Sequence, residues 1–188
     1  MEYNLATKST LRRVVYRLMK ITVTAGSGTG STTLSAFDAA LKAAGIHNYN
    51  IIKLSSVIPP ESDVVVKKWK NASTEHGKKL YTVLAEIRTD IMGRSIAAGI
   101  GWYQTKDGRG VFAEHTDMIE RLNAKEAEEN VTKKIEATVR DLCAHRGYPF
   151  NKRNFKQIIS STEVKDKPTC TLVAAVYESQ DFDQSSKL

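Results

Sequence analysis

The chain has 188 residues, of which 41% are hydrophobic and 26% are charged, a composition that is typical of a globular protein and excludes disordered, collagen-like and low-complexity classes. The 28 Lys and Arg residues exceed the 21 Asp and Glu residues and give a formal net charge of +7, which would suit a nucleic-acid or acidic-lipid partner. Cys143 and Cys170 lack metal-ligand spacing, and no apolar run approaches the ~20 residues of a membrane span. We therefore expect one domain over residues 1–188, in the reducing cytoplasm, with no metal and no membrane partner.

Two elements are predicted at the start of the chain. The β-branched run 13–25 predicts a strand, and we expect the glycine-rich stretch 26–30 to end it as a tight turn. The same glycines could present N–H groups to a phosphate, but their G-x-G-x-G spacing matches no nucleotide-binding loop and favours a simple connection. Residues 35–45 follow as a helix with one apolar face, which Gly45 ends in the left-handed conformation.

A second strand is predicted over residues 48–58. Pro59 and Pro60 close it, because proline cannot continue a ladder of backbone hydrogen bonds. The polar, lysine-rich stretch 61–77 then predicts a connection, and it is the segment that we expect to be a mobile loop.

Three further strands are predicted in the middle of the chain. They cover residues 79–88, 94–104 and 110–115. The stretch 106–108, Lys-Asp-Gly, is a hairpin signal that joins the second of these strands to the third.

The last part of the chain predicts one long helix and two strands. Asn123 caps the helix with Glu126 in a variant of the capping box, and Gly147 and Pro149 end it. One face of the helix is apolar, formed by Val131, Ile135, Val139 and Leu142. Residues 154–163 and 169–178 predict a closing hairpin. Many strands, hairpin-like connections and only two substantial helices together predict an α+β sandwich rather than a doubly wound parallel sheet.

Two acidic residues are candidates for chemistry. Asp38 is a lone acid in the alanine-rich helix; it is either a solvated surface residue, which the sequence favours, or a carboxylate that holds a cation. Glu114 follows an apolar run and is either a surface charge or, if buried, a carboxyl of raised pKa that could donate a proton. His47 and His115 are solitary, and a structural role is the default interpretation of both.

The least ordinary segment is 54–60, in which two serines end an apolar strand shortly before two prolines. The simple interpretation is strand termination. The alternative is a strained peptide bond at which a hydroxyl attacks the preceding carbonyl, since strain accompanies reactive sites. The sequence disfavours a serine hydrolase because it has no G-x-S-x-G elbow.

Residues 25–62 resemble the N-terminal half of the pyruvoyl-dependent arginine decarboxylases. This stretch carries, in order, an Ala-Gly-Ser turn, Ala-Phe-Asp, Ala-Gly-Ile, Asn-x-Asn and Ser-Ser-x-x-Pro-Pro-Glu. The remaining chain is similar in pattern, and Glu114 falls where the family carries its acid. The resemblance implies a four-layer αββα sandwich with largely antiparallel sheets, assembled as a homotrimer or a dimer of trimers with active sites between neighbouring subunits.

The resemblance also implies that the chain cleaves itself between Ser55 and Ser56. The Ser56 hydroxyl would attack the Ser55 carbonyl, the resulting ester would eliminate to dehydroalanine, and hydrolysis would leave a pyruvoyl group at position 56. The products would be a β chain, 1–55, and an α chain, 56–188. The pyruvoyl carbonyl would form a Schiff base with L-arginine and act as the electron sink for decarboxylation to agmatine and CO2, so that no diffusible cofactor is needed.

The family's functional residues match positions in this sequence. Asn50 matches an asparagine that assists processing, by stabilising the oxyanion with its side-chain amide. Glu114 matches the proton donor that acts after CO2 leaves, and Asp38 matches the acid that pairs with the guanidinium group. His47 replaces a residue that is often small in the family and lies beside the presumed substrate cleft, so that it and Ser55 complete the expected substrate-binding residues.

Three alternatives remain open at this point. One is a scaffold that resembles the family but does not process itself. The same chemistry could act on another amino acid, such as lysine, histidine or ornithine. In a different class, a basic nucleic-acid-binding module would use two clusters of positive charge, but neither cluster lies in an RNA-recognition motif, and we do not expect a nucleic-acid partner. The clusters are Lys67, Lys68 and Lys70, and Lys152, Arg153 and Lys156.

Overall fold

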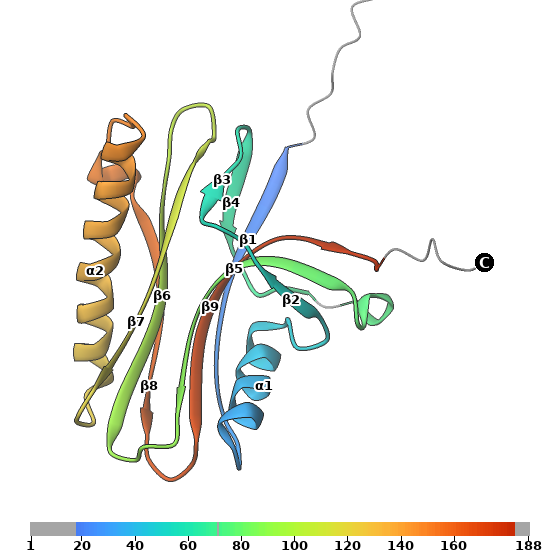
Figure 1. Ribbon diagram of the computed structural model, residues 1–188, viewed down its shortest axis with the longest axis vertical. Coiled ribbons are helices and arrows are strands. Elements are labelled where there is room, and N and C mark those ends of the chain that lie inside the picture. Colours follow the sequence, from blue (N-terminus) through green and yellow to red (C-terminus); the bar gives the residue numbers. More distant parts are fainter. Residues whose placement is uncertain (1–17, 71, 183–188) are drawn as a thin grey trace, which may run out of the picture.

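The computed structural model describes residues 18–70 and 72–182. Figure 1 shows a layered molecule in which α1 covers one sheet, a second sheet packs on the first, and α2 covers the outside of the second. The predicted α+β sandwich with two main helices is confirmed. The elements are β1 (Met19–Thr29), α1 (Thr33–Ala44), β2 (Asn50–Lys53), β3 (Val57–Ile58), β4 (Ser62–Val66), η1 (Ser73–Glu75), β5 (Lys79–Thr89), β6 (Arg94–Gln104), β7 (Gly110–Ile119), α2 (Ala124–His145), η2 (Lys152–Asn154), β8 (Lys156–Val164) and β9 (Thr169–Gln180).

The first sheet has the strand order β2-β5-β9-β1-β4, and the second has the order β3-β7-β6-β8. In the part of the chain that the structure describes, only the pairs β1 with β4 and β2 with β5 are parallel, so the sheets are largely antiparallel, as expected. The predicted hairpin of residues 154–163 with 169–178 is wrong, because β8 pairs with β6 whereas β9 pairs with β1 and β5. The short turn between β8 and β9 carries the chain from one sheet to the other, which strand periodicity alone cannot distinguish from a hairpin.

Apolar side chains fill the space between each pair of layers. Trp102 and Phe112 lie between the two sheets and are almost fully buried. The predicted apolar face of α2 is confirmed at Val131, Ile135 and Val139, which have no exposed surface. Burying each such side chain stabilises the fold by about 1.5–3 kcal/mol.

The glycine-rich stretch 26–30 is not the predicted turn, because β1 continues through most of it. A Cβ atom on Gly28 would lie 2.6 Å from the backbone of Ala39 in α1. The stretch therefore lets helix and strand approach closely, which no larger residue would allow. The predicted end of α1 is confirmed, since Gly45 adopts a left-handed φ of 86°.

The predicted strand 48–58 is interrupted. Its first part forms β2 at the edge of the first sheet, and its last two residues form β3 at the edge of the second. Leu54, Ser55 and Ser56 connect the two sheets. The interruption lies at the serine pair that the sequence marked as unusual.

The prediction that the lysine-rich stretch 61–77 is a connecting, mobile loop is wrong for residues 62–66, because they form β4, which pairs in parallel with β1. Beyond β4, Trp69 Nε1 donates a hydrogen bond of 3.1 Å to the Tyr49 hydroxyl, which itself donates to the Glu75 carboxylate. Burial, and then the bond to Glu75, raises the pKa of Tyr49 to about 12. These contacts attach the stretch to the residues that precede β2.

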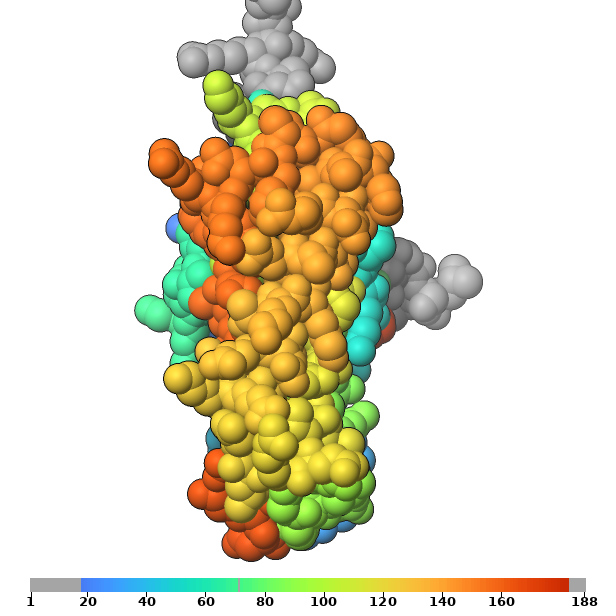
Figure 2. All heavy atoms as spheres, turned by 90° about the vertical axis from the view of Figure 1, so that its left-hand side faces the viewer, coloured from blue at the N-terminus to red at the C-terminus, as the bar shows by residue number. Residues whose placement is uncertain are grey.

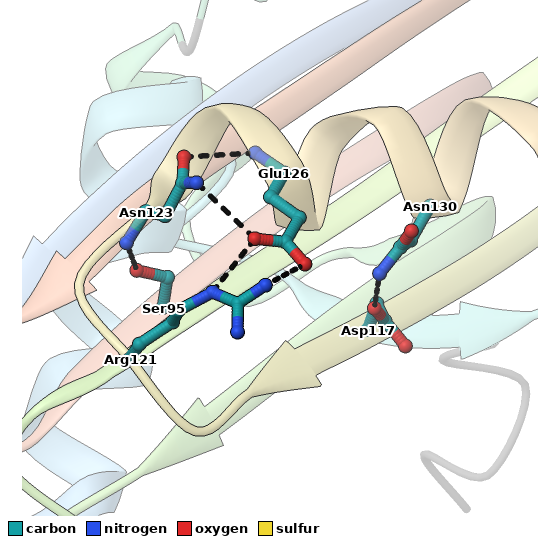
Figure 3. Close-up of polar contacts among 6 residues, drawn as sticks. All are labelled: Ser95, Asp117, Arg121, Asn123, Glu126 and Asn130. Atoms are coloured by element: carbon teal, nitrogen blue, oxygen red, sulfur yellow. Dashed lines mark hydrogen bonds and ion pairs between the residues drawn. The ribbon is translucent and has the colours of Figure 1, made fainter.

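A polar network fixes the N-terminus of α2 to the second sheet (Figure 3). As predicted, Asn123 caps α2: its Oδ1 accepts from the Glu126 N–H at 3.2 Å, and its own N–H donates to Ser95 Oγ on β6 at 2.7 Å. Arg121 donates hydrogen bonds from Nε and Nη2 to the two oxygens of the Glu126 carboxylate. The network holds α2 over β6 and β7, and β7 carries Glu114.

Residues 13–17 of the first expected strand lie outside the described residues. Within residues 18–70 and 72–182, no helix is long and apolar enough to cross a membrane. The same residues contain no group of three or more His, Cys, Asp or Glu side chains that could hold a metal ion.

Candidate active site

The segment from Leu54 to Ser56 spans the edges of both sheets. On one side, the Leu54 N–H donates to the carbonyl of Thr82 on β5 at 2.9 Å. On the other side, the N–H of Phe112 on β7 donates to the Ser56 carbonyl, also at 2.9 Å. The backbone around the serine pair is therefore held at both ends while the pair itself crosses the gap.

The side chain of Ser56 is positioned by Glu114. Ser56 Oγ donates a hydrogen bond of 2.6 Å to Glu114 Oε2. Glu114 is exposed and Ser56 is partly buried. The carboxylate orients the hydroxyl, and it is close enough to exchange a proton with a group at position 56.

The Ser55 carbonyl accepts a hydrogen bond from the Val57 N–H at 2.8 Å. This bond closes a tight turn around Ser56, the residue whose hydroxyl would attack that carbonyl. An N–H on a carbonyl oxygen favours negative charge there and would stabilise a tetrahedral adduct.

Tyr177 of β9 reaches from the first sheet to the same segment. Its hydroxyl donates to the Val57 carbonyl at 2.7 Å, and its ring meets Phe112 edge-on with centroids 6.2 Å apart. Burial, followed by the nearby charge of Glu114, raises the pKa of Tyr177 above its ordinary value. The phenol therefore stays protonated and remains a donor at neutral pH.

Glu114 lines a cavity of about 280 Å³ between residues of β2, β5 and β7. Glu86 also lines it; its side chain is only 18% exposed, and its buried Oε2 has no hydrogen-bond partner within the described residues. Arg88 Nε is 3.8 Å from that oxygen, too far for a hydrogen bond, and the Arg88 guanidinium stacks on the ring of Phe37. The cavity is lined by Lys53, Leu84, Ala85, Glu86, Glu114, His115 and Thr116.

Comparison with known proteins decides the family. The family model described as pyruvoyl-dependent arginine decarboxylase matches residues 20–182. The chain belongs to this family of pyruvoyl-dependent arginine decarboxylases. Members of this family are enzymes that use a pyruvoyl group and act on a small-molecule substrate. Membership therefore favours an enzyme over a nucleic-acid-binding module.

Curated arginine decarboxylases support the assignment over most of the chain. The pyruvoyl-dependent arginine decarboxylases of Thermococcus sibiricus and Pyrococcus abyssi are each 35% identical over 159 residues, which cover 84% of this chain and 93% of theirs. The enzyme of Methanocaldococcus jannaschii is 35% identical over 113 residues, 59% of this chain and 64% of its own.

The chain brings together some of the residues predicted from the family resemblance and not others. Ser55, Ser56 and Glu114 meet at the connection between the sheets. Asp38 is exposed on α1 and does not line the cavity beside Glu114. His47 follows α1 and is partly buried, with no hydrogen-bond partner on Nδ1 among the described residues. Asn50 donates its side-chain amide to the Gly77 carbonyl at 2.6 Å.

His115 connects two elements and also lines the cavity beside Glu114, so its structural role stays a prediction. Its Nε2 lies 2.7 Å from Thr138 Oγ1, which links β7 to α2. Burial, followed by the charge of Lys134, lowers the pKa of His115, and Glu114 opposes this effect. The imidazole is therefore mostly neutral at neutral pH.

Two residues of this region, Glu86 and Tyr177, were not predicted from the sequence. Glu86 lies in a β-strand where one charge between apolar residues gives no signal, and only the register of β5 places it in the cavity. Tyr177 lies in an apolar strand of a kind that normally enters a core. Only the tertiary structure brings Tyr177 to Val57 and Glu86 to the cavity beside Glu114.

A larger cavity of about 720 Å³ lies at one end of the molecule, between the β6–β7 turn and the end of α2. Figure 2 shows the outer face of α2, which runs upward to the orange residues near its C-terminal end. The cavity is lined in part by Lys106, Arg109 and Arg146 and by none of the predicted site residues. Size alone therefore does not identify the active site.

Proposed function

We propose that this chain is a self-processing decarboxylase that converts L-arginine to agmatine and CO2, using a pyruvoyl group made from Ser56. The observation that carries the proposal is the hydrogen bond of 2.6 Å between the Ser56 hydroxyl and Glu114, at an exposed connection between two sheets, in a chain of this family. Family membership supports the reaction type, and the local geometry supports the assignment of residues.

Self-processing is proposed to occur at the bond between Ser55 and Ser56, in one domain that yields chains 1–55 and 56–188. The Ser56 hydroxyl adds to the Ser55 carbonyl, the C–N bond breaks, and the hydroxyl proton ends on the Ser56 nitrogen. Loss of the Ser56 Cα proton then breaks the new ester and releases the Ser55 carboxylate. One water replaces the nitrogen, which leaves as ammonia.

The residues present fit the group that this sequence of steps makes. Phe112 holds the carbonyl of residue 56 through its N–H, and this bond joins two parts of the α chain, so cleavage does not break it. When present, the pyruvoyl group supplies a carbonyl that withdraws electrons from the bond to the departing carboxylate. Glu114, which touches the side chain of residue 56, is placed to hold the proton that replaces that carboxylate.

Recognition of a cationic substrate is proposed to be local, since the net charge of +7 does not favour it. Glu86 and Glu114 offer carboxylates inside the cavity. Asp38 is proposed to bind the guanidinium from a neighbouring subunit of a homotrimer or a dimer of trimers. In support, Asp38 and Leu34, which is 68% exposed, lie one helical turn apart on the surface of α1. Ser55 and His47 are proposed to complete the substrate contacts.

Asn50 remains the proposed aid to processing. Its amide is bonded to Gly77, and the donor on the Ser55 carbonyl within this chain is the Val57 N–H. An Asn50→Ala variant should therefore cleave more slowly if the amide acts on the reacting peptide, and at the normal rate if its role is limited to the turn at Gly77.

Intact-mass measurement of the purified protein tests the proposal. We expect two fragments separated after residue 55, with a carbonyl-reactive terminus on the larger one, and we expect Ser56→Ala to remain a single chain. The processed protein should release CO2 from arginine faster than from lysine, histidine or ornithine. A wild-type chain that stays uncut after prolonged incubation at neutral pH would contradict self-processing.

A further inference from the structure

We infer that Tyr177 is a positioning residue for self-processing, and that its hydroxyl holds the peptide beside the bond that breaks. The inference rests on the proposed function and extends it to a residue outside the 25–62 motif. Tyr177 is far from Ser55 in sequence and lies on a different strand, yet its hydroxyl is 2.7 Å from the Val57 carbonyl oxygen.

The Tyr177 hydroxyl satisfies a carbonyl at the edge of a sheet. β3 has only two residues and pairs on one side, with β7. Among residues 18–70 and 72–182, no strand therefore pairs with the other side of β3, and the Tyr177 hydroxyl binds the Val57 carbonyl there. Because the ring of Tyr177 packs on Phe112, the hydroxyl has little freedom to leave.

Two contacts from the protein thus fix the backbone on both sides of Val57 Cα. The Phe112 N–H holds the Ser56 carbonyl, which belongs to the same peptide plane as the Val57 N–H. Tyr177 holds the next carbonyl along the chain. With both planes fixed, the Val57 N–H stays directed at the Ser55 oxygen, 2.8 Å away.

This orientation matters in the first step of processing. When the Ser56 oxygen adds to the Ser55 carbon, the Ser55 oxygen gains negative charge, and a fixed N–H stabilises it without reorganisation. Tyr177 touches none of the reacting atoms and acts through Val57. Loss of a direct oxyanion donor slows a reaction about 10²–10³-fold, so loosening that donor should cost less, about tenfold.

Two of these hydrogen bonds persist after cleavage: the one from Phe112 to the carbonyl of residue 56 and the one from Tyr177 to Val57. All four residues belong to the α chain. Tyr177 then continues to hold the new terminus within β3. Its hydroxyl therefore serves two stages, the formation of the acyl ester and the retention of residue 56 beside Glu114.

The test compares full-length Tyr177→Phe with wild type and with a matched control, Tyr81→Phe. The Tyr81 hydroxyl donates to Gln180 at 2.7 Å on the same sheet, so the control removes a similar hydrogen bond away from residues 54–57. Freshly synthesised precursor is incubated, and intact mass follows the appearance of the two fragments. We expect Tyr177→Phe to cleave about tenfold more slowly and Tyr81→Phe to match wild type, with similar melting temperatures for all three.

Hydroxylamine identifies the step, because it cleaves the ester directly and bypasses elimination. It should not restore the rate of Tyr177→Phe if formation of the ester is slow. Restoration by hydroxylamine, or cleavage of Tyr177→Phe at the wild-type rate, would overturn the role assigned to Tyr177 while leaving the proposed function intact. An uncut wild-type chain would instead overturn both.

Discussion

The Ser56 hydroxyl and the Glu114 carboxylate lie 2.6 Å apart although 58 positions separate them in the sequence. The proximity arises from β7, because Phe112, two residues before Glu114, binds the Ser56 backbone through its N–H. One strand therefore places both the backbone of the serine segment and the carboxyl that contacts its side chain. The distance between Ser56 and Glu114 therefore depends on how β7 holds the serine segment.

Glu114→Gln should separate processing from turnover. The amide oxygen of glutamine can accept the same hydrogen bond from Ser56, so the hydroxyl keeps its orientation and cleavage proceeds. Glutamine cannot deliver a proton, and decarboxylation should fall about 10²–10⁴-fold. Intact mass measures the first effect and CO2 release per processed chain measures the second. Normal turnover in this variant would rule out Glu114 as the proton donor.

Glu86→Gln should weaken the binding of arginine. The substitution removes a charge from the cavity next to Glu114, where Oε2 has no hydrogen-bond partner among the described residues and Arg88 Nε is 3.8 Å away, but keeps the size of the side chain. We expect KM for arginine to rise about tenfold, the loss of one modest charge contact, with the rate of cleavage unchanged. Glu178→Gln, at an exposed position on β9, is the control and should behave as wild type. An unchanged KM would show that Glu86 does not bind substrate.

His115 should make the fold less stable in acid. Burial, and then Lys134, lowers the pKa of His115, so the folded state resists a proton that the unfolded chain accepts. The unfolded state therefore binds more protons as the pH falls through the ordinary histidine pKa, and stability is lost in that direction. Urea unfolding at about pH 7.5 and about pH 5.5 should show a larger drop for wild type than for His115→Gln. Equal drops would mean that the histidine does not contribute.

Gly28→Ala should destabilise the fold by about 1–3 kcal/mol. The new Cβ would lie 2.6 Å from the backbone of Ala39, so α1 would have to move away from β1. Gly93→Asn is a suitable control, because Gly93 has a φ of 77°, which asparagine tolerates, and no atom lies within 4 Å of its Cβ position. Urea unfolding measures both variants. A stable Gly28→Ala protein would mean that the close approach is not required.

The sequence predicted the elements better than their connections. The apolar face at Val131, Ile135 and Val139 and the cap at Asn123 were predictable because helix periodicity and capping are local. The partners of β8 and β9 were not, because a short turn can join strands of one sheet or of two. The stretch around Gly28 was wrongly predicted to be a turn for a related reason. Glycine is common both in turns and where a helix packs closely on a strand, and the sequence does not distinguish the two.

The candidate site was predictable only where it lies in a contiguous motif. Ser55 and Ser56 stand in such a motif, and Glu114 falls at a matching position. Glu86 and Tyr177 enter the region through the register of β5 and β9, which depends on the pairing of strands distant in sequence. Asp38 differs from these residues: the motif predicts that it binds substrate, but within one chain it does not line the cavity beside Glu114.

The separation of Asp38 from the cavity leads to a prediction about assembly. If each site takes residue 56 from one subunit and Asp38 from the next, then Ser56→Ala and Asp38→Asn chains, each defective alone, should complement each other when co-expressed. With equal amounts of both chains in a symmetric ring, about a quarter of the sites would combine two intact residues. Activity close to that fraction of wild type supports a shared site. Mixing the two proteins only after purification is the control, because assembled subunits should not exchange, and no gain on co-expression would place Asp38 and Ser56 in the same subunit's site or Asp38 outside the site altogether.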